Sequence, residues 1–432
     1  MIQIQVNNLG ALRQATFSLG EITIICGGNN TGKTYATYAL FGFLSAWREV
    51  FTIEIAENKI KQLLDEGVTH IDVSEYIGQA EQIVAAGCRD YTQRLPKIFA
   101  ASAERFKDTE FQIFLDAKQV RATGKYDRKM RAANAELFAI SKQEHETDLV
   151  VTLLVEKEKV KIPTDVITHF IATALKDILF STFFPKPFIA SAERTGAAIF
   201  RKELNFARNR LLEEMSQSNK NVDPFQLLFK DYQDYALPVK SNVEFVRQLE
   251  TIAKNESFLT QQHPEILANF ADIIGGEYTV TDNDELYYIP KGSKKVKLTM
   301  DESSSAVRSL LDIGFYLRHV VQPGDLLMVD EPELNLHPEN QRRIARLFAR
   351  LANLGIKIFI TTHSDYIVKE LNTLIMLNHD KPHLKRIAEQ EGYQTEELLA
   401  ADKVKVYIAE KASIKLDEWE TQNRLSNPDS GR

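Results

Sequence analysis

A glycine-rich loop at residues 27–34 constrains the fold of this chain more than any other part of its sequence. The loop reads GGNNTGKT and satisfies the spacing G-x-x-x-x-G-K-[ST] in full. An apolar run at residues 21–26 precedes it, and residues 34–47 carry apolar side chains at helical spacing. A strand, a glycine-rich loop and a helix in this order predict a loop that curls around phosphate groups.

The residue types in the loop suit the binding of ATP. Glycines let successive backbone N–H groups point at phosphate oxygens, and the start of the next helix adds partial positive charge. We expect Lys33 to neutralise the β- and γ-phosphates, as a catalytic and a binding residue, and Thr34 to bind Mg²⁺. The predicted nucleotide contacts of the loop are Gly27, Asn29, Asn30, Thr31, Gly32, Lys33 and Thr34.

Two acids and a histidine follow apolar strands further along the chain. The apolar run at residues 326–329 ends in Asp330 and Glu331, and the run at 357–361 precedes His363. Because ligands bind at the carboxyl edge of parallel sheets, these side chains are expected to meet the phosphate loop there. Asp330 is suited to hold Mg²⁺, Glu331 to polarise the attacking water, and His363 to contact the γ-phosphate.

The order of elements predicts an α/β fold with a mainly parallel core sheet. From residue 304, apolar strands alternate with helices, a pattern typical of a parallel sheet covered on both faces. Alternating short strands before this part predict an antiparallel β subdomain. The expected helices lie at 306–321, 338–354 and 366–371, the core strands at 187–191, 326–329, 357–361 and 374–377, and the antiparallel strands at 278–280, 285–289 and 296–300.

Composition divides the chain into an ATPase domain and two additions. The ATPase domain is expected to be split between residues 1–48 and 185–380. Residues 49–184 are rich in helix formers and mixed charge, notably at 54–66 and 118–146, and predict a mostly helical insertion with one strand pair, at 149–155 and 159–162. Residues 381–432 are expected to form a C-terminal extension with one edge strand, at 403–409, and a polar tail.

Bulk properties exclude several classes of protein. A net charge of −7 argues against a surface that grips nucleic acid as a whole. Two cysteines provide no disulfide framework, and no signal peptide or membrane span is visible, so we expect a cytoplasmic protein without a membrane partner. A basic cluster at residues 118–131 keeps a DNA-binding ATPase of the repair kind as the alternative, although acids flank the cluster.

Three motifs in order, GGNNTGKT, LLMVDEPELNLHP and IFITTHSD, resemble the ABC-type ATPases of the SMC, OLD and defence-associated groups. The resemblance implies an ABC-type P-loop fold, a D-loop at residues 333–338, and a homodimer or higher homo-oligomer that sandwiches ATP between subunits. It also implies that Ser304 or Ser305 caps the γ-phosphate of the partner's ATP. The usual paired glycines are absent, with Ala306 at an expected glycine, so a simple helix cap is the alternative.

The same resemblance covers the run SAERTG at residues 191–196, a strand-end element of the defence ATPases. Arg194 in this run is expected either to face the nucleotide or the dimer interface, or to form a structural ion pair. The residues after His363 contain no Asp-x-Asp pair of an OLD-type nuclease. By resemblance to PARIS-type and Septu-type two-gene antiphage systems, the ATPase is expected to control a separate effector, a nuclease or a toxin.

Overall fold

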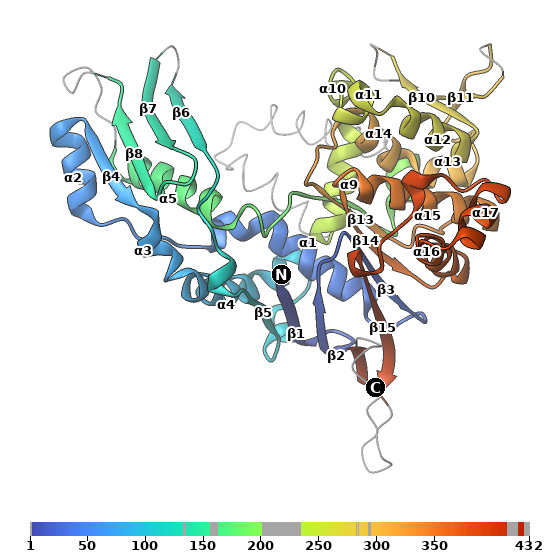
Figure 1. Cartoon of the computed structure of the whole chain (residues 1–432), viewed down its shortest axis with the longest axis horizontal. Helices are drawn as coiled ribbons and strands as arrows, with labels where there is room; N and C mark the ends of the chain where they lie inside the picture. Colours follow the sequence, from blue (N-terminus) through green and yellow to red (C-terminus); the bar gives the residue numbers. More distant parts are fainter. Residues whose placement is uncertain are drawn as a thin grey trace, which may run out of the picture. The chain divides into compact units, whose positions relative to one another are not determined.

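A computed structural model describes residues 2–132, 135–155, 163–200, 235–281, 283, 285–292, 295–412 and 422–426. They form two compact units (Figure 1). Unit 1 contains Met1–Val6, Phe43–Arg94 and Glu110–Pro185, and unit 2 contains Asn7–Gly42, Leu95–Thr109 and Lys186–Arg432. The expected strand at 159–162 and the tail after residue 426 lie outside the described residues.

The core sheet of unit 2 confirms the predicted α/β class. Its strands are β2 (Leu12–Ser18), β3 (Ile22–Gly27), β9 (Pro187–Ala190), β13 (Leu326–Asp330), β14 (Lys357–Thr362), β15 (Val404–Ala412) and β16 (Gln422–Ser426). They lie in the order β2-β16-β15-β3-β14-β13-β9. Five neighbours, β15, β3, β14, β13 and β9, run parallel. The sheet is therefore mainly parallel, as the sequence predicts.

The register of the central strands brings their carboxyl ends to one edge of the sheet. Asp330 of β13 lies opposite Thr361 of β14, and Thr362 lies opposite Cys26 of β3. Every residue of β13 is buried, because a strand inside a parallel sheet is covered on both faces. The edge therefore carries Gly27, Asp330 and Thr362 on three adjacent strands.

Helices with one apolar face pack on this sheet. In α15 the residues Ile344, Leu347, Phe348 and Leu351 recur at helical spacing and are buried. They share a core with Ile24 and Ile360 of the sheet. The helices of this unit include α6 (Arg194–Ile199), α9 (Leu237–Arg247), α10 (Leu249–Ile252), α11 (Phe258–Gln262), α12 (Pro264–Ile274), α13 (Ser305–Ser309), α14 (Leu311–His319), α15 (Pro338–Asn353), α16 (Asp365–Leu377) and α17 (Pro382–Gln390).

Two predictions about the end of this unit are wrong. The expected strand at 374–377 is the end of α16, since Leu371, Leu374 and Leu377 recur every three residues and continue its buried face. The expected strand at 403–409 is not at an edge. The observed strand, β15, pairs with β3 on one side and β16 on the other.

The predicted antiparallel subdomain is present. It is a three-stranded sheet of β10 (Gly276–Val280), β11 (Leu286–Pro290) and β12 (Leu298–Thr299), in that order. Short 3₁₀ turns occur elsewhere in the chain, at Ala103–Phe106, Ala117–Gln119, Thr395–Glu397 and Ala401–Lys403. Within the described residues, no helix is long and apolar enough to cross a membrane.

Unit 1 contains the expected helices, with more β structure than the sequence predicts. Helix α1 (Lys33–Val50) belongs to unit 1 from Phe43 onwards, and α4 (Ala80–Ile98) belongs to it up to Arg94. The other helices are α2 (Glu57–Glu66), α3 (Val73–Ile77) and α5 (Thr164–Phe180). A four-stranded sheet has the order β4-β8-β7-β6, formed by Val68–Asp72, Asp148–Leu153, Ala135–Lys142 and Tyr126–Ala132. The remaining strands are β1 (Gln3–Leu9), which belongs to unit 1 up to Val6, and β5 (Glu110–Phe114).

The prediction of helix for residues 118–146 is wrong, because charged residues obscure the alternation of buried and exposed side chains that is typical of a strand. Phe138, Ile140 and Lys142 alternate along β7 and are all buried. Lys142 is accepted in this core because its ammonium donates to the carbonyl oxygens of Ala122, Gln143 and Glu146, at 2.7, 2.9 and 3.0 Å. A buried lysine of this kind is not distinguishable from an exposed one by sequence pattern alone.

Candidate functional site

The phosphate loop adopts a conformation that needs glycine at two positions. Gly27 has a φ of +148° and Gly32 a φ of +93°. A Cβ atom on Gly27 would lie 2.2 Å from the carbonyl oxygen of Ala409, and one on Gly32 would lie 2.5 Å from Cδ2 of Leu12. Gly28 has open space instead, with its nearest neighbour 4.0 Å away. Residues of β15 and β2 thus leave no room for a side chain at Gly27 and Gly32, whereas Gly28 is accessible.

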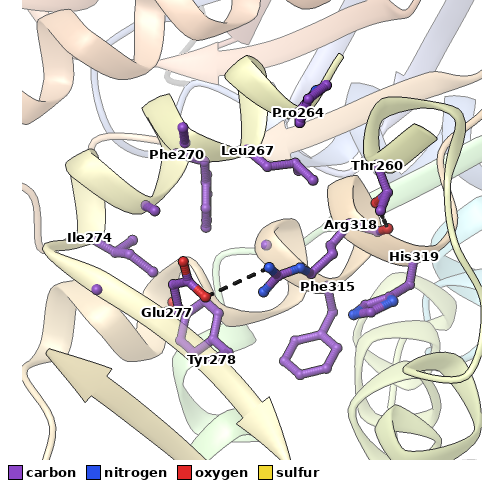
Figure 2. A pocket seen from close by; sticks show the side chains of 14 residues that line it. Thr260, Pro264, Leu267, Phe270, Ile274, Glu277, Tyr278, Phe315, Arg318 and His319 are labelled. Atoms are coloured by element: carbon purple, nitrogen blue, oxygen red, sulfur yellow. Dashed lines mark hydrogen bonds and ion pairs between the residues drawn. The ribbon is translucent and has the colours of Figure 1, made fainter. Parts of the chain in front are cut away.

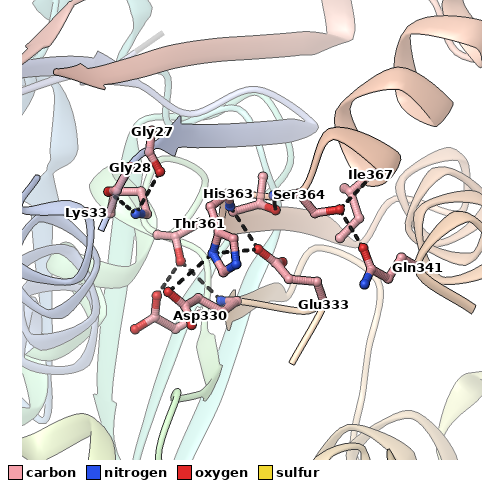
Figure 3. A network of polar contacts seen from close by, with 12 residues as sticks. Gly27, Gly28, Lys33, Asp330, Glu333, Gln341, Thr361, His363, Ser364 and Ile367 are labelled. Atoms are coloured by element: carbon pink, nitrogen blue, oxygen red, sulfur yellow. Dashed lines mark hydrogen bonds and ion pairs between the residues drawn. The ribbon is translucent and has the colours of Figure 1, made fainter. Parts of the chain in front are cut away.

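Lys33 is buried against the loop, whereas Thr34 is exposed and contacts β13. The Lys33 ammonium donates to the carbonyl oxygens of Gly27 and Gly28, at 3.0 and 2.8 Å (Figure 3). The Thr34 hydroxyl donates to Oδ2 of Asp330 at 3.2 Å. The loop and the β13 acid, 296 residues apart in sequence, therefore meet as predicted.

The other residues of the loop that are predicted to contact the nucleotide differ in their exposure to solvent. Asn29 and Asn30 are exposed, and Asn30 has a φ of +60°. Thr31 is buried and its hydroxyl donates to the carbonyl oxygen of Gly28 at 2.9 Å. Thr31 therefore shapes the loop from within, while the two asparagines face solvent.

Asp330 is a buried carboxylate held by two threonine hydroxyls. Its side chain is 1% exposed, and both Thr361 and Thr34 donate to it. Burial raises the pKa of Asp330, and the two threonine hydroxyls act in the opposite direction. An ordered carboxylate beside a hydroxyl is the oxygen pair that Mg²⁺ takes in phosphate-loop sites.

Glu331, the next residue, has a different environment. Its backbone φ is +52°, a conformation that costs a non-glycine residue roughly 1–2 kcal/mol. Its N–H donates to the carbonyl oxygen and to the hydroxyl of Thr361, at 3.1 and 3.2 Å. Its side chain is 27% exposed, in contrast to that of Asp330. The strained backbone thus turns two consecutive acids to different sides of the strand end.

His363 contacts two acids, Glu331 and Glu333, in the segment that follows β13. Its Nδ1 atom lies 3.2 Å from Oε1 of Glu333 and 3.7 Å from Oε1 of Glu331. Its backbone N–H also donates to Oε1 of Glu333 at 2.8 Å (Figure 3). Glu333 is buried, and its Oε2 accepts no hydrogen bond from the described residues. The family resemblance places Glu333 in a D-loop, and the sequence does not predict its contact with the imidazole of His363.

Comparison with known proteins assigns a family to this arrangement. Residues 1–368 match the family described as the AAA ATPase domain, which covers the phosphate loop, both acids and the histidine. The chain belongs to the AAA ATPase domain family. No curated protein matches the chain.

Solved structures similar to this ATPase domain are distant. They include an SMC head bound to the C-winged helix domain of ScpA, at 10% identity and a TM-score of 0.35 over 99% of this chain and 98% of that chain. The SMC head domain from Thermotoga maritima has 9% identity and a TM-score of 0.32 over 98% and 97%. An SMC head domain with an extended coiled coil, bound to the C-terminal domain of ScpA derived from Pyrococcus furiosus, has 11% and 0.33 over 99% and 97%.

The serines predicted to act on a partner's ATP lie at the start of α13. Ser304 caps this helix, since its Oγ accepts the backbone N–H of Val307 at 3.3 Å. Ser305 is exposed beside it, and Ser303 is buried. No contact within the described part of the chain joins Ser304 or Ser305 to the phosphate loop of their own subunit. The cap that the sequence allows as an alternative is therefore present, and the role towards a partner remains a prediction.

Arg194 of this ATPase domain lies inside the protein, next to the acids. Its guanidinium donates to the carbonyl oxygens of Ser191, Ser309, Asp330 and Glu331. Burial lowers the pKa of Arg194, and the nearby carboxylates, Asp312 first, raise it. Among the described contacts, Arg194 binds main-chain oxygens of its own subunit and forms no ion pair.

The ATPase domain also contains a partly open pocket lined by none of these residues. It has a volume of about 260 Å³ and lies between α12, the start of β10 and α14 (Figure 2). Arg318 and Glu277 form a 3.7 Å ion pair across it. None of the predicted site residues lines this pocket. The predicted site residues lie instead at the carboxyl edge of the unit 2 sheet.

Proposed function

We propose that this ATPase domain hydrolyses ATP to ADP and phosphate at the carboxyl edge of the unit 2 sheet. The observation that carries the proposal is the 3.2 Å hydrogen bond from the Thr34 hydroxyl, beside Lys33 at the start of α1, to Asp330 at the end of β13. Glu331 and His363 stand beside them. A glycine-rich loop, a compact cation and two acids in this arrangement suit phosphoryl transfer to water.

Each side chain has one role in the proposed reaction. Lys33 neutralises the β- and γ-phosphates, and the backbone N–H groups of the loop bind their oxygens. Thr34 and Asp330 would hold Mg²⁺, whose charge offsets that of the phosphates. Glu331, partly exposed, accepts a hydrogen bond from the attacking water and orients it. His363, held by Glu333, donates a hydrogen bond to the γ-phosphate.

Lys33→Ala tests nucleotide binding directly. The variant should lose ATP affinity by at least tenfold, because the phosphates lose their compact positive charge. Lys254→Ala is the control, since Lys254 is an exposed residue whose ammonium lies 3.8 Å from Glu250. Equilibrium binding of a fluorescent ATP analogue measures both. Equal affinity of Lys33→Ala and wild type would contradict the proposed site.

We further propose that ATP joins two copies of the chain. Support comes from the exposure of Ser304 and Ser305, which leaves both hydroxyls accessible to a second subunit, and from the resemblance to ATPases that sandwich ATP. The mass of Glu331→Gln in solution should double when ATP and Mg²⁺ are added, and that of Lys33→Ala should not. A Glu331→Gln protein that binds ATP and remains monomeric would contradict the sandwich.

The proposed role of this ATPase is to control a separate effector protein, a nuclease or a toxin, in antiphage defence. The resemblance to two-gene systems supports this step. Copurification with the product of the neighbouring gene tests it, and a stoichiometric complex is the expected result.

The alternative, direct action on DNA, has less support. In the basic cluster, Arg128 pairs with Asp177, and Lys129 and Arg131 pair with Glu136. These carboxylates offset the positive charge that would otherwise attract the phosphates of DNA. Tight, steeply salt-dependent DNA binding by the chain alone would favour the alternative over effector control.

A further inference from the structure

The strongest unassigned feature near the acids is the hydrogen bonding of Arg194. Its Nε donates to Ser309 at 2.7 Å, and Nη1 donates to Ser191 at 2.8 Å and to Asp330 at 2.7 Å. Its Nη2 donates to Glu331 at 2.8 Å. All four acceptors are main-chain carbonyl oxygens. One side chain therefore ties together the ends of β9, α13 and β13.

The buried charge has a counter-charge and a rigid frame. Asp312 on α14 is fully buried and is the carboxylate with the largest electrostatic effect on Arg194. Asn242 joins Asp312 to the residue after β9: its amide donates to Asp312 at 3.3 Å, and its oxygen accepts the N–H of Ser191 at 2.8 Å. Because these groups are buried and hydrogen-bonded, the guanidinium has little freedom to move.

The contact with Glu331 has a specific consequence. The N–H of Glu331 is held by Thr361, and its carbonyl oxygen is held by Arg194. Hydrogen bonds thus hold both the N–H and the carbonyl group of Glu331, whose φ is +52°. Because the backbone of a residue sets the direction of its side chain, these contacts decide where the Glu331 carboxylate points.

We propose that Arg194 is a positioning residue, which holds Glu331 in its strained conformation and so aims the carboxylate at the attacking water. This inference rests on the proposed function, because it assigns Arg194 a role through the proposed base. Lysine cannot replace the arginine, since a single ammonium lacks the fixed fork of N–H donors that reaches four separate oxygens.

Arg194→Lys, alone and combined with Glu331→Gln, provides the test. The single variant should bind ATP within about threefold of wild type and have a kcat at least tenfold lower, with little change in KM. In the Glu331→Gln background the same substitution should change the single-turnover rate less than twofold. This non-additivity is expected because Arg194 acts through Glu331, whereas a purely structural role would lower both rates by the same factor.

Lys142→Met is the matched control for losing a buried cation. Lys142 also donates to main-chain carbonyl oxygens, but it lies in unit 1. Its loss should lower the melting temperature and leave kcat unchanged. If Arg194→Lys does not fold, Arg194→Gln, with a planar amide and two N–H donors, takes its place in the same test. Failure of both variants to fold would overturn the proposal in favour of a structural role.

Two further outcomes separate this inference from the proposed function. If Arg194→Lys had a normal kcat while Glu331→Gln was inactive, only the positioning role would be overturned. If Glu331→Gln hydrolysed ATP at the wild-type rate, the proposed base itself would be wrong. An equal fall of ATP affinity and rate in Arg194→Lys would also overturn positioning, since binding would then account for the loss.

Discussion

Asp330 and Glu331 are neighbours in sequence with different surroundings. Asp330 is buried and bonded to two hydroxyls, which suits a metal ligand, whereas Glu331 has a partly exposed side chain that water can reach. The division depends on the positive φ of Glu331, which turns the chain between them. One strained residue thus allows two adjacent acids to serve different proposed roles.

Glu333→Gln tests the pairing with His363. The buried Glu333 carboxylate contacts both Nδ1 and the backbone N–H of His363, so a neutral amide should hold the imidazole less firmly. We expect kcat to fall about tenfold and KM to change less than threefold, because the substitution acts on the orientation of the imidazole and leaves the phosphate loop intact. Steady-state ATP hydrolysis measures both constants.

Glu339→Gln is the control for Glu333→Gln. Glu339 lies in the first turn of α15, is exposed, and pairs only with Arg343 among the described contacts. Its substitution should leave kcat and KM unchanged. A Glu333→Gln variant as active as Glu339→Gln would show that the imidazole does not depend on its buried partner.

The residues of the site differ in how far the sequence predicts them. Lys33, Asp330 and His363 follow strand patterns, and the convergence of parallel strand ends makes their meeting predictable. The contacts of Glu333 and Arg194 were not predictable in this way. Arg194 binds main-chain oxygens, which every residue has, so no partner residue type marks the interaction in the sequence.

At the scale of elements, β15 shapes the phosphate loop. It runs parallel to β3, and its residue Ala409 lies opposite Gly27. The carbonyl oxygen of Ala409 occupies the space that a side chain on Gly27 would need. Strand β15, near the end of the chain, therefore restricts which residue can stand at position 27 of the N-terminal loop.

Gly27→Ala should damage the loop where Gly28→Ala should not. The new Cβ on Gly27 meets backbone at 2.2 Å and imposes a φ of +148° on alanine, so we expect a loss of about 1–3 kcal/mol in unfolding free energy. Gly28 has open space, and its alanine variant should stay within about 0.5 kcal/mol of wild type. Urea unfolding compares the three proteins, and equal midpoints would contradict the account of β15.

The wrong predictions of helices and strands have a common cause. Residues 374–377 and 126–142 are short apolar or charge-masked runs in which helix and strand periods are hard to tell apart. Strands β13 and β14 were predictable because their continuous apolar runs end in polar residues. Tertiary pairing decides the ambiguous runs, and pairing is not visible in a local pattern.

At the scale of the whole molecule, the proposed site belongs to one compact unit. Its loop, acids and histidine all lie in unit 2, although they come from both ends of the chain. The units differ from the sequence-based division, since residues 95–109 belong to unit 2 and residues 43–48 to unit 1. Composition does not reveal such an exchange, because the segment at 95–109 resembles its neighbours.

The core of unit 2 should make the stability of the protein depend on pH. Burial raises the pKa of Asp312 to about 6, from an ordinary value of 3.8. Between these values the folded carboxyl retains its proton longer than the unfolded one, so its contribution to stability is full below pH 4 and is lost as pH rises to about 6. The change amounts to about 3 kcal/mol.

Asp312→Asn isolates this contribution. Relative to Asp312→Asn, wild type should lose unfolding free energy between about pH 4 and pH 6.5, because asparagine does not titrate. Urea unfolding of both proteins across this range measures the difference. A difference that stays constant, or that grows in favour of wild type as pH rises, would contradict a buried protonated carboxyl.

The central claim is that Glu331 serves as the base for ATP hydrolysis at this sheet edge, and single-turnover hydrolysis by Glu331→Gln tests it most directly. The substitution preserves size and removes the acceptor charge. The account predicts that the variant binds ATP with wild-type affinity and cleaves it at least a hundredfold more slowly. Cleavage at the wild-type rate would contradict the account.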